Sequence, residues 1–166
     1  MNSRFLKGMV VTAAIVLSGL SGPAWAGGSD DLGCSNATLK GAYAFGVTNY
    51  AFALVVTGIE IFDGNGKFTQ RDYAGDSVPA EFSPPGRENG TYTVNPDCTG
   101  SAVLNLNVPG VPPGTSHGVV KTLFVISNGG RHIHDVVSEF TPPGATGPVP
   151  AQTSSDAWKV ASQQDD

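Results

Sequence analysis

Three histidines come nearest to forming a chemical site. His132 and His134 stand two positions apart in an apolar segment, so on an extended strand both imidazoles project from one face. That spacing suits two ligands of one zinc or copper ion, and His117 could supply a third if its strand pairs nearby. One strand brings only two ligands, Asp135 should face away from both rings, and exposed strand histidines are common. We therefore predict no metal site and no cofactor.

Acidic pairs are the next candidates. Asp72 with Asp76, or Glu81 with Glu88, could meet in space as a general acid and base. In a chain with 14 acidic residues, solvated surface charge is the better explanation. No serine lies in a G-x-S-x-G nucleophile motif, and no glycine-rich phosphate motif occurs. The sequence identifies no catalytic residue, leaves open whether the protein is an enzyme, and favours one without catalysis.

Two glycine-rich segments predict hairpin turns. Asp63-Gly64-Asn65-Gly66 has some calcium-loop character, but an EF-hand loop needs more oxygen ligands and a terminal Glu, whereas this segment runs into Lys67. Asn128-Gly129-Gly130 also offers residues that tolerate positive φ. Each segment should close an antiparallel hairpin.

Short apolar and β-branched segments, punctuated by Gly, Pro, Asn and Asp, predict an all-β protein. Between some of them lie Pro-rich segments that should be irregular loops bordering a binding site or acting as spacers. These loops are 77–87, 109–116 and 141–153. The expected strands are 41–49, 52–62, 67–74, 90–94, 101–108, 119–127 and 131–140, with a last one near 157–161.

The alternation within these strands predicts a barrel. Tyr43, Phe45 and Val47 share one face of the first strand, and small residues line the other. Segments 52–62 and 119–126 are largely apolar on both faces. We expect one antiparallel barrel of about eight strands, closed or nearly closed, with its outer apolar face covered by a loop, a like subunit or a bound apolar molecule. Small interior residues would leave room for a ligand, whereas aromatic ones would fill the core.

The first 26 residues have the features of a secretory leader. Arg4 and Lys7 precede an apolar run, and Ala24-Trp25-Ala26 has the small-x-small pattern of a signal peptidase site. The run is shorter than the about 20 residues that span a bilayer, and no second one follows, so we expect no transmembrane segment after cleavage. Residues 27–166 should form a single soluble domain with a frayed tail, exported to the bacterial periplasm or medium.

Charge and cysteine content narrow the possible partners. Without Arg4 and Lys7 the mature chain has 7 basic and 14 acidic residues, which argues against a nucleic-acid partner. Its two cysteines, Cys34 and Cys98, should form a disulfide in an oxidising compartment. A reactive thiol or a metal ligand is the competing interpretation, although neither cysteine has a His nearby in sequence and no CxxC motif occurs.

Three ordered motifs resemble a group of small exported bacterial proteins that are mostly uncharacterised. They are Cys34-Ser35-Asn36-Ala37-Thr38-Leu39-Lys40-Gly41-Ala42-Tyr43, Ile61-Phe62-Asp63-Gly64-Asn65-Gly66-Lys67-Phe68 and Gly90-Thr91-Tyr92-Thr93-Val94-Asn95-Pro96-Asp97-Cys98-Thr99-Gly100. The resemblance covers most of the mature chain to about Phe140. It implies a compact barrel similar to calycins and to allene oxide cyclase, and it brings no catalytic residues. Fold alone does not fix activity.

Three functions follow as hypotheses. The favoured one is a non-enzymatic barrel that binds a small apolar ligand or a like subunit. The first alternative is a cyclase or isomerase of the allene oxide cyclase type, in which a preshaped apolar cavity directs ring closure. A buried polar group in a real cavity, such as Asn49, Asn105 or Glu60, would favour this enzyme. The second alternative is a structural role at the cell surface or in a matrix.

Overall fold

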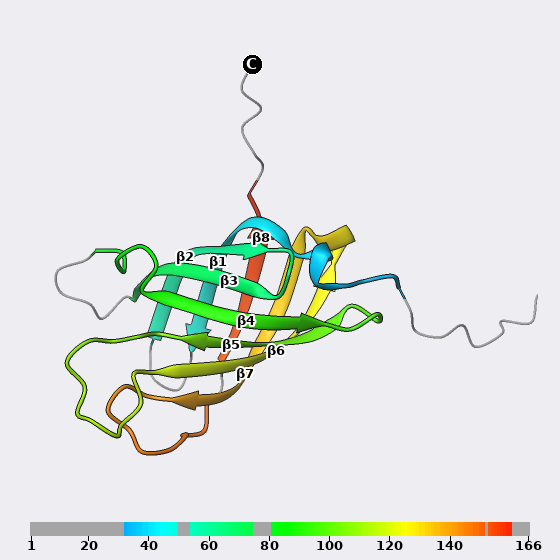
Figure 1. Ribbon diagram of the computed structural model, residues 1–166. Coiled ribbons are helices and arrows are strands. Elements are labelled where there is room, and N and C mark those ends of the chain that lie inside the picture. Colours follow the sequence, from blue (N-terminus) through cyan, green and yellow to red (C-terminus); the bar gives the residue numbers. More distant parts are fainter. Residues whose placement is uncertain (1–31, 50–53, 75–80, 152, 161–166) are drawn as a thin grey trace, which may run out of the picture.

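Each of the eight strands pairs antiparallel with the next along the chain, and β8 pairs with β1 to close a barrel (Figure 1). The computed structural model describes residues 32–49, 54–74, 81–151 and 153–160. The predicted all-β fold and closed antiparallel barrel are confirmed. The strands are β1 (Lys40–Asn49), β2 (Leu54–Asp63), β3 (Lys67–Ala74), β4 (Glu88–Val94), β5 (Thr99–Asn105), β6 (Val119–Ser127), β7 (His132–Thr141) and β8 (Thr153–Lys159).

Two strands, β5 and β8, have a bound that differs by three or more residues from the one expected. β5 ends at Asn105, before the predicted Val108, and Asn107 has a φ of 49°, which an extended strand does not accommodate. β8 begins at Thr153, ahead of the predicted 157, because Ser154 and Ser155 also pair with β1 in the antiparallel ladder. The expected start of the second strand, at Phe52, lies outside the described residues.

Short turns lie at one end of the barrel and long loops at the other (Figure 1). Both predicted hairpins are confirmed. Asp63 Oδ1 accepts hydrogen bonds from the backbone N–H groups of Asn65 at 2.7 Å and Lys67 at 3.0 Å. Residues 128–130 form the 3₁₀ turn η2 between β6 and β7, with positive φ throughout. The Pro-rich connections therefore gather at the end opposite these turns.

The N-terminal segment closes the short-turn end. The 3₁₀ helix η1 (Asn36–Thr38) lies across it, and Asn36 Oδ1 accepts a hydrogen bond from Val94 N at 2.8 Å. Tyr92 Oη donates to the carbonyl oxygen of the fully buried Leu39 at 2.9 Å. Cys34 and Cys98 form the expected disulfide, with their Cα atoms 5.1 Å apart. The bond attaches this closing segment to the β4–β5 turn and fits an oxidising environment.

An aromatic cluster fills the barrel beneath η1. The Phe62 ring lies 5.3 Å from Tyr43, 5.2 Å from Phe68 and 5.1 Å from Tyr92, measured between ring centroids. The pairs with Tyr43 and Tyr92 are edge-to-face and the pair with Phe68 is stacked. Aromatic pairs of these kinds add about 0.5–1.5 kcal/mol each to the effect of burial. Gly90 of β4 faces this cluster, and a Cβ there would overlap the Phe68 ring. The bulky face of the first strand thus fills only one end of the interior.

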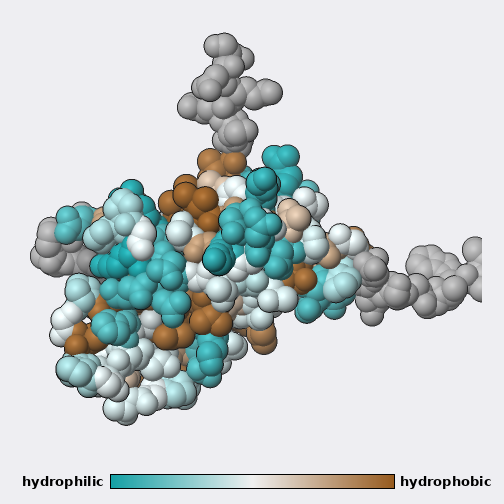
Figure 2. Space-filling view, in the orientation of Figure 1, coloured by the Kyte–Doolittle hydropathy of each residue, from teal (hydrophilic) through white to brown (hydrophobic). Residues whose placement is uncertain are grey.

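Apolar side chains also lie on the outside of the barrel, where they interrupt a largely polar surface (Figure 2). Val55 and Ile61 on β2 are 57% and 52% exposed, and Leu123 and Val125 on β6 are 54% and 50% exposed. The apolar residues on both faces of these segments predicted that the outer faces are covered. No described loop covers these four residues, and their burial in a homo-oligomer stays a prediction.

The expected leader, residues 1–26, and the end of the tail, 161–166, lie outside the described part of the chain. Within the described ranges, no helix has the length and apolar character needed to cross a bilayer.

Candidate functional site

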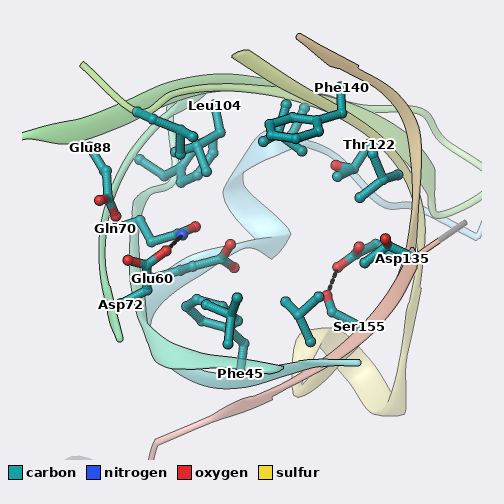
Figure 3. Close-up of a pocket in the computed structure, with 18 of the residues that line it drawn as sticks. Phe45, Glu60, Gln70, Asp72, Glu88, Leu104, Thr122, Asp135, Phe140 and Ser155 are labelled. Atoms are coloured by element: carbon teal, nitrogen blue, oxygen red, sulfur yellow. Dashed lines mark hydrogen bonds between the residues drawn. The ribbon is translucent and has the colours of Figure 1, made fainter. Parts of the chain in front are cut away.

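The end of the barrel away from η1 contains a cavity of about 670 Å³. Figure 3 shows it in the barrel lumen, with side chains projecting inward from opposite walls. The loops at this end contribute Val108, Pro142 and Val149 to its lining. Two of the Pro-rich segments therefore border the cavity, 77–87 through Arg87 and 141–153 through Pro142 and Val149, and Val108 directly precedes the third. Its volume falls within the roughly 300–1,000 Å³ of typical small-molecule sites.

Most of the cavity wall is apolar because inward positions alternate along each strand. The aromatic cluster forms its floor through Phe62 and Phe68. Above that floor, aliphatic and aromatic side chains come from strands around the whole barrel. They include Val47, Val56, Leu104, Leu106, Val120 and Phe140. An apolar body of drug-like size would find contacts on every side.

Glu60 places a carboxyl group in this apolar space. It follows Val56 and Gly58 on the inward face of β2, and it points into the lumen (Figure 3). Its remaining accessible surface opens on the cavity. Removal from water raises the pKa of Glu60 to about 8, and the negative charges of Asp135 and Asp72 contribute to the rise. Glu60 is therefore mainly protonated at neutral pH and can donate a hydrogen bond.

Asp135 faces the lumen from β7, on the opposite wall (Figure 3). Ser155 of β8 lies directly across in the strand register and donates its hydroxyl hydrogen to Asp135 Oδ2. Burial raises the pKa of Asp135 to about 6, the Ser155 hydrogen bond opposes this rise, and the charge of Asp156 on the outer face adds to it. At pH 7 Asp135 is thus mainly ionised while Glu60 is mainly neutral.

A second set of polar side chains lies on the wall formed by β3 and β4. Gln70 Nε2 donates to Asp72 Oδ2 at 2.8 Å. The Glu88 side chain is 1% exposed, and its Oε1 pairs with Arg87 Nη2 at 2.7 Å. Burial raises the pKa of Glu88, although the hydrogen bond and charge of Arg87 oppose the rise. Glu88 Oε2 and Arg87 Nε have no hydrogen-bond partner among the described residues.

Of the two acidic pairs suggested by spacing, Glu81 with Glu88 is divided between the outer surface and the lumen, and Asp72 with Asp76 is not tested by the described residues. Asp72 and Glu88 both line the cavity, and the charge of Asp72 acts on Glu88. Glu81 is exposed, and Asp76 lies outside the described residues. The acidic groups face one another because β2, β3, β4 and β7 direct them into the same lumen, which spacing along the chain does not reveal.

The three histidines separate into two places. His132 and His134 share one face of β7, as expected, and that face is the outer one, whereas the adjacent Asp135 faces inward. His117 precedes β6 and contacts the Val108 carbonyl oxygen through Nδ1 at 2.8 Å. The antiparallel register pairs His132 with Ser127 at the far end of β6, so the idea that His117 completes their ligand set is wrong.

Sequence reasoning missed Asp135, Ser155 and Asp156 as site residues. One signal was available for Asp135: it lies two residues from Ile133 and from Val137, so it shares the inward face of the strand with apolar neighbours. Of the three polar residues named for the enzyme alternative, Glu60 lines the cavity. Asn105 instead lies outside, where its Nδ2 donates to Asn89 O, and the Asn49 side chain lies outside the described atoms.

Neither protein-family models nor curated proteins match the chain.

Proposed function

We propose that this protein is an exported, calycin-like binding barrel that takes a small, mainly apolar molecule into its lumen without transforming it. The observation that carries the proposal is the cavity of about 670 Å³, with a closed aromatic floor, an apolar wall and loops at its mouth. Binding sites for small molecules combine an apolar wall with a few polar groups that fix orientation. The disulfide between Cys34 and Cys98 supports a place outside the cytoplasm.

The polar groups define which molecules fit. Glu60 in its neutral form donates one hydrogen bond, and ionised Asp135 accepts one from the other side of the lumen. Asp72 and Glu88 add acidic groups, and Arg87 is the basic residue in the cavity lining. An apolar ligand with a hydroxyl, carbonyl or amino group meets these requirements. A carboxylate ligand would face like charge and is disfavoured.

The first experiment is native mass spectrometry of the protein purified from the periplasm or medium of its own host, followed by denaturing extraction. We expect an added mass that is lost on extraction and that belongs to an uncharged or amino-bearing apolar compound. A bare mass, together with no binding of apolar probes, would contradict the proposal and favour a structural role. A mass that is a multiple of the chain would support the predicted homo-oligomer.

Two alanine-to-phenylalanine variants, one in the lumen and one on the surface, test whether apolar molecules bind in the cavity. Ala102 lines the lumen on β5, whereas Ala44 is exposed on β1. Ala102→Phe should lower the affinity for the uncharged fluorophore N-phenyl-1-naphthylamine by at least roughly tenfold, about 1.4 kcal/mol. Ala44→Phe should leave the affinity unchanged. Equal affinities for the two variants would show that the probe binds elsewhere, and circular dichroism verifies that both have folded.

One observation favours a second candidate, an isomerase or cyclase. Glu60 and Asp135 are a neutral acid and an ionised base at pH 7, and pairs of groups with separated pKa values are typical of acid–base catalysis. Glu60 would give a proton to the substrate while Asp135 removes another, so the product has the same mass. Glu60→Gln should then retain the extracted ligand without converting it. Chromatography that shows no conversion by the wild type would exclude this candidate for that ligand.

A further inference from the structure

A cluster of metal-binding side chains lies on the outside of the barrel, separate from the cavity. The strand register pairs His132 with Trp158 and His134 with Asp156 across β7 and β8. Residues directly opposite in antiparallel strands project from the same face. His132 and His134 are two positions apart in the sequence, so their imidazoles and the Asp156 carboxylate lie close together on the outer face of the sheet.

Three ligand atoms converge on this outer face. Asp156 Oδ1 lies 2.6 Å from His134 Nδ1 and 3.1 Å from His132 Nε2. All three atoms lie within 4.8 Å of one another. Metal–ligand bonds of about 2.0–2.2 Å place adjacent ligand atoms roughly 3 Å apart. Only small side-chain shifts are therefore needed for the three atoms to surround one ion.

The ligands combine a fixed position with access from solvent. The His132 ring stacks on Trp158, with centroids 3.4 Å apart and planes inclined by 14°, and its side chain is 9% exposed. The His134 and Asp156 side chains are 55% and 59% exposed. Stacking holds one imidazole in place, and the other two groups leave an open approach for an ion with its remaining water ligands.

We propose that His132 Nε2, His134 Nδ1 and Asp156 Oδ1 bind one divalent transition-metal ion of the zinc, nickel and copper(II) class. Two imidazoles and one carboxylate suit these ions, and such a three-ligand set leaves positions open for water or another donor. This site does not depend on the proposed function of the cavity. Asp156 supplies the third ligand that the histidine spacing alone lacked.

Calorimetric titration of the full chain with Zn²⁺ tests the site. We expect one ion per chain, and at least roughly tenfold weaker binding after His134→Ala or Asp156→Asn, since loss of outer-sphere partners alone costs about 10–100-fold. His117→Ala is the matched control and should bind as the wild type does. No saturable binding, or equal affinity for His117→Ala and His134→Ala, would overturn the proposal.

Trp158 provides a second readout tied to position. Copper(II) bound at His132 should quench the fluorescence of the stacked indole with the same affinity that calorimetry with copper(II) gives. Trp158→Phe should lose that signal yet still bind one ion. Quenching that persists in Asp156→Asn at unchanged copper concentrations would show that the ion binds elsewhere and would contradict the assignment.

Discussion

Glu60 on β2 and Asp135 on β7 face each other across the barrel lumen, and the negative charge of Asp135 helps to raise the pKa of Glu60 (Figure 3). Burial is the largest cause of the raised pKa of each carboxyl group. The lumen thus keeps Glu60 protonated at a pH at which an exposed carboxyl group is ionised. This relationship makes both the stability of the barrel and the polarity of its cavity depend on pH.

Stability should respond to Glu60→Gln in a pH-dependent way. Between its ordinary value of 4.5 and the folded-state value of about 8, the native protein keeps a proton on Glu60 that the unfolded chain has lost. The free energy of unfolding contributed by Glu60 therefore falls as pH rises through this window and levels off above it. Relative to the wild type, the variant should gain up to about 1.4 kcal/mol per pH unit. Urea unfolding from pH 5 to pH 9 measures this difference.

The control for this prediction is Glu81→Gln. The Glu81 side chain is exposed, so water hydrates both of its protonation states. The free energy of unfolding of the Glu81→Gln variant should therefore depend on pH in the same way as that of the wild type. A Glu60→Gln profile that is also parallel to the wild type would mean that the Glu60 carboxyl group is hydrated like an ordinary surface acid, and the description of the lumen as apolar would be wrong.

Uptake of an uncharged apolar probe should weaken at alkaline pH. As Glu60 ionises around pH 8, a charge enters the cavity, and an apolar guest would have to displace the water that solvates it. We expect roughly tenfold weaker binding of N-phenyl-1-naphthylamine at pH 9.5 than at pH 6.5, about 1.4 kcal/mol, and no such change in Glu60→Gln. Fluorescence titration at both pH values distinguishes these outcomes. The same pH dependence in both proteins would assign the effect to another group.

Local sequence signals predicted much of the barrel. Asp63 and the glycines around Asn65 can make few structures other than a tight turn, and the side-chain hydrogen bonds of Asp63 confirm it. Two cysteines offer only one intramolecular pairing, so Cys34 and Cys98 could be matched without knowledge of the fold. Alternation also separated the bulky and small faces of β1, because side chains on a strand alternate with a period of two.

The sites were less predictable because they join residues through strand register. His134 and Asp156 are 22 positions apart in the sequence and become neighbours only when β7 and β8 pair. The same applies to Glu60 and Asp135, which meet only after the sheet closes on itself. The antiparallel hairpin predicted at residues 128–130 already implied that His117, which precedes β6, lies far from the start of β7. The register, with Ser127 opposite His132, agrees with that hairpin.

Removal of the disulfide should lower stability substantially. Cys34 and Cys98 are 64 positions apart, and a loop of this length corresponds to roughly 4 kcal/mol in the chain-entropy model. The double variant Cys34→Ser with Cys98→Ser should lose about 2–5 kcal/mol of the free energy of unfolding, measured in urea at pH 7. A reducing agent should lower the stability of the wild type to a similar extent and leave the variant unchanged. Equal stability with and without reductant would show that the bond does not constrain the unfolded chain.

The aromatic floor of the cavity should tolerate no added methyl group at Gly90. A Cβ at this position would overlap both the Phe68 ring and the carbonyl oxygen of Val103, so the ring and the β4–β5 pairing would have to shift together. Overpacking of this kind costs about 1–3 kcal/mol, and we expect Gly90→Ala to lower the free energy of unfolding by that amount.

Gly46→Ala is the matched control, since a Cβ there meets no atom within 4 Å. It should be neutral or slightly stabilising, because alanine has less backbone freedom to lose on folding. Equal destabilisation by the two substitutions would mean that backbone conformation, and not contact with Phe68, is the reason for glycine at position 90.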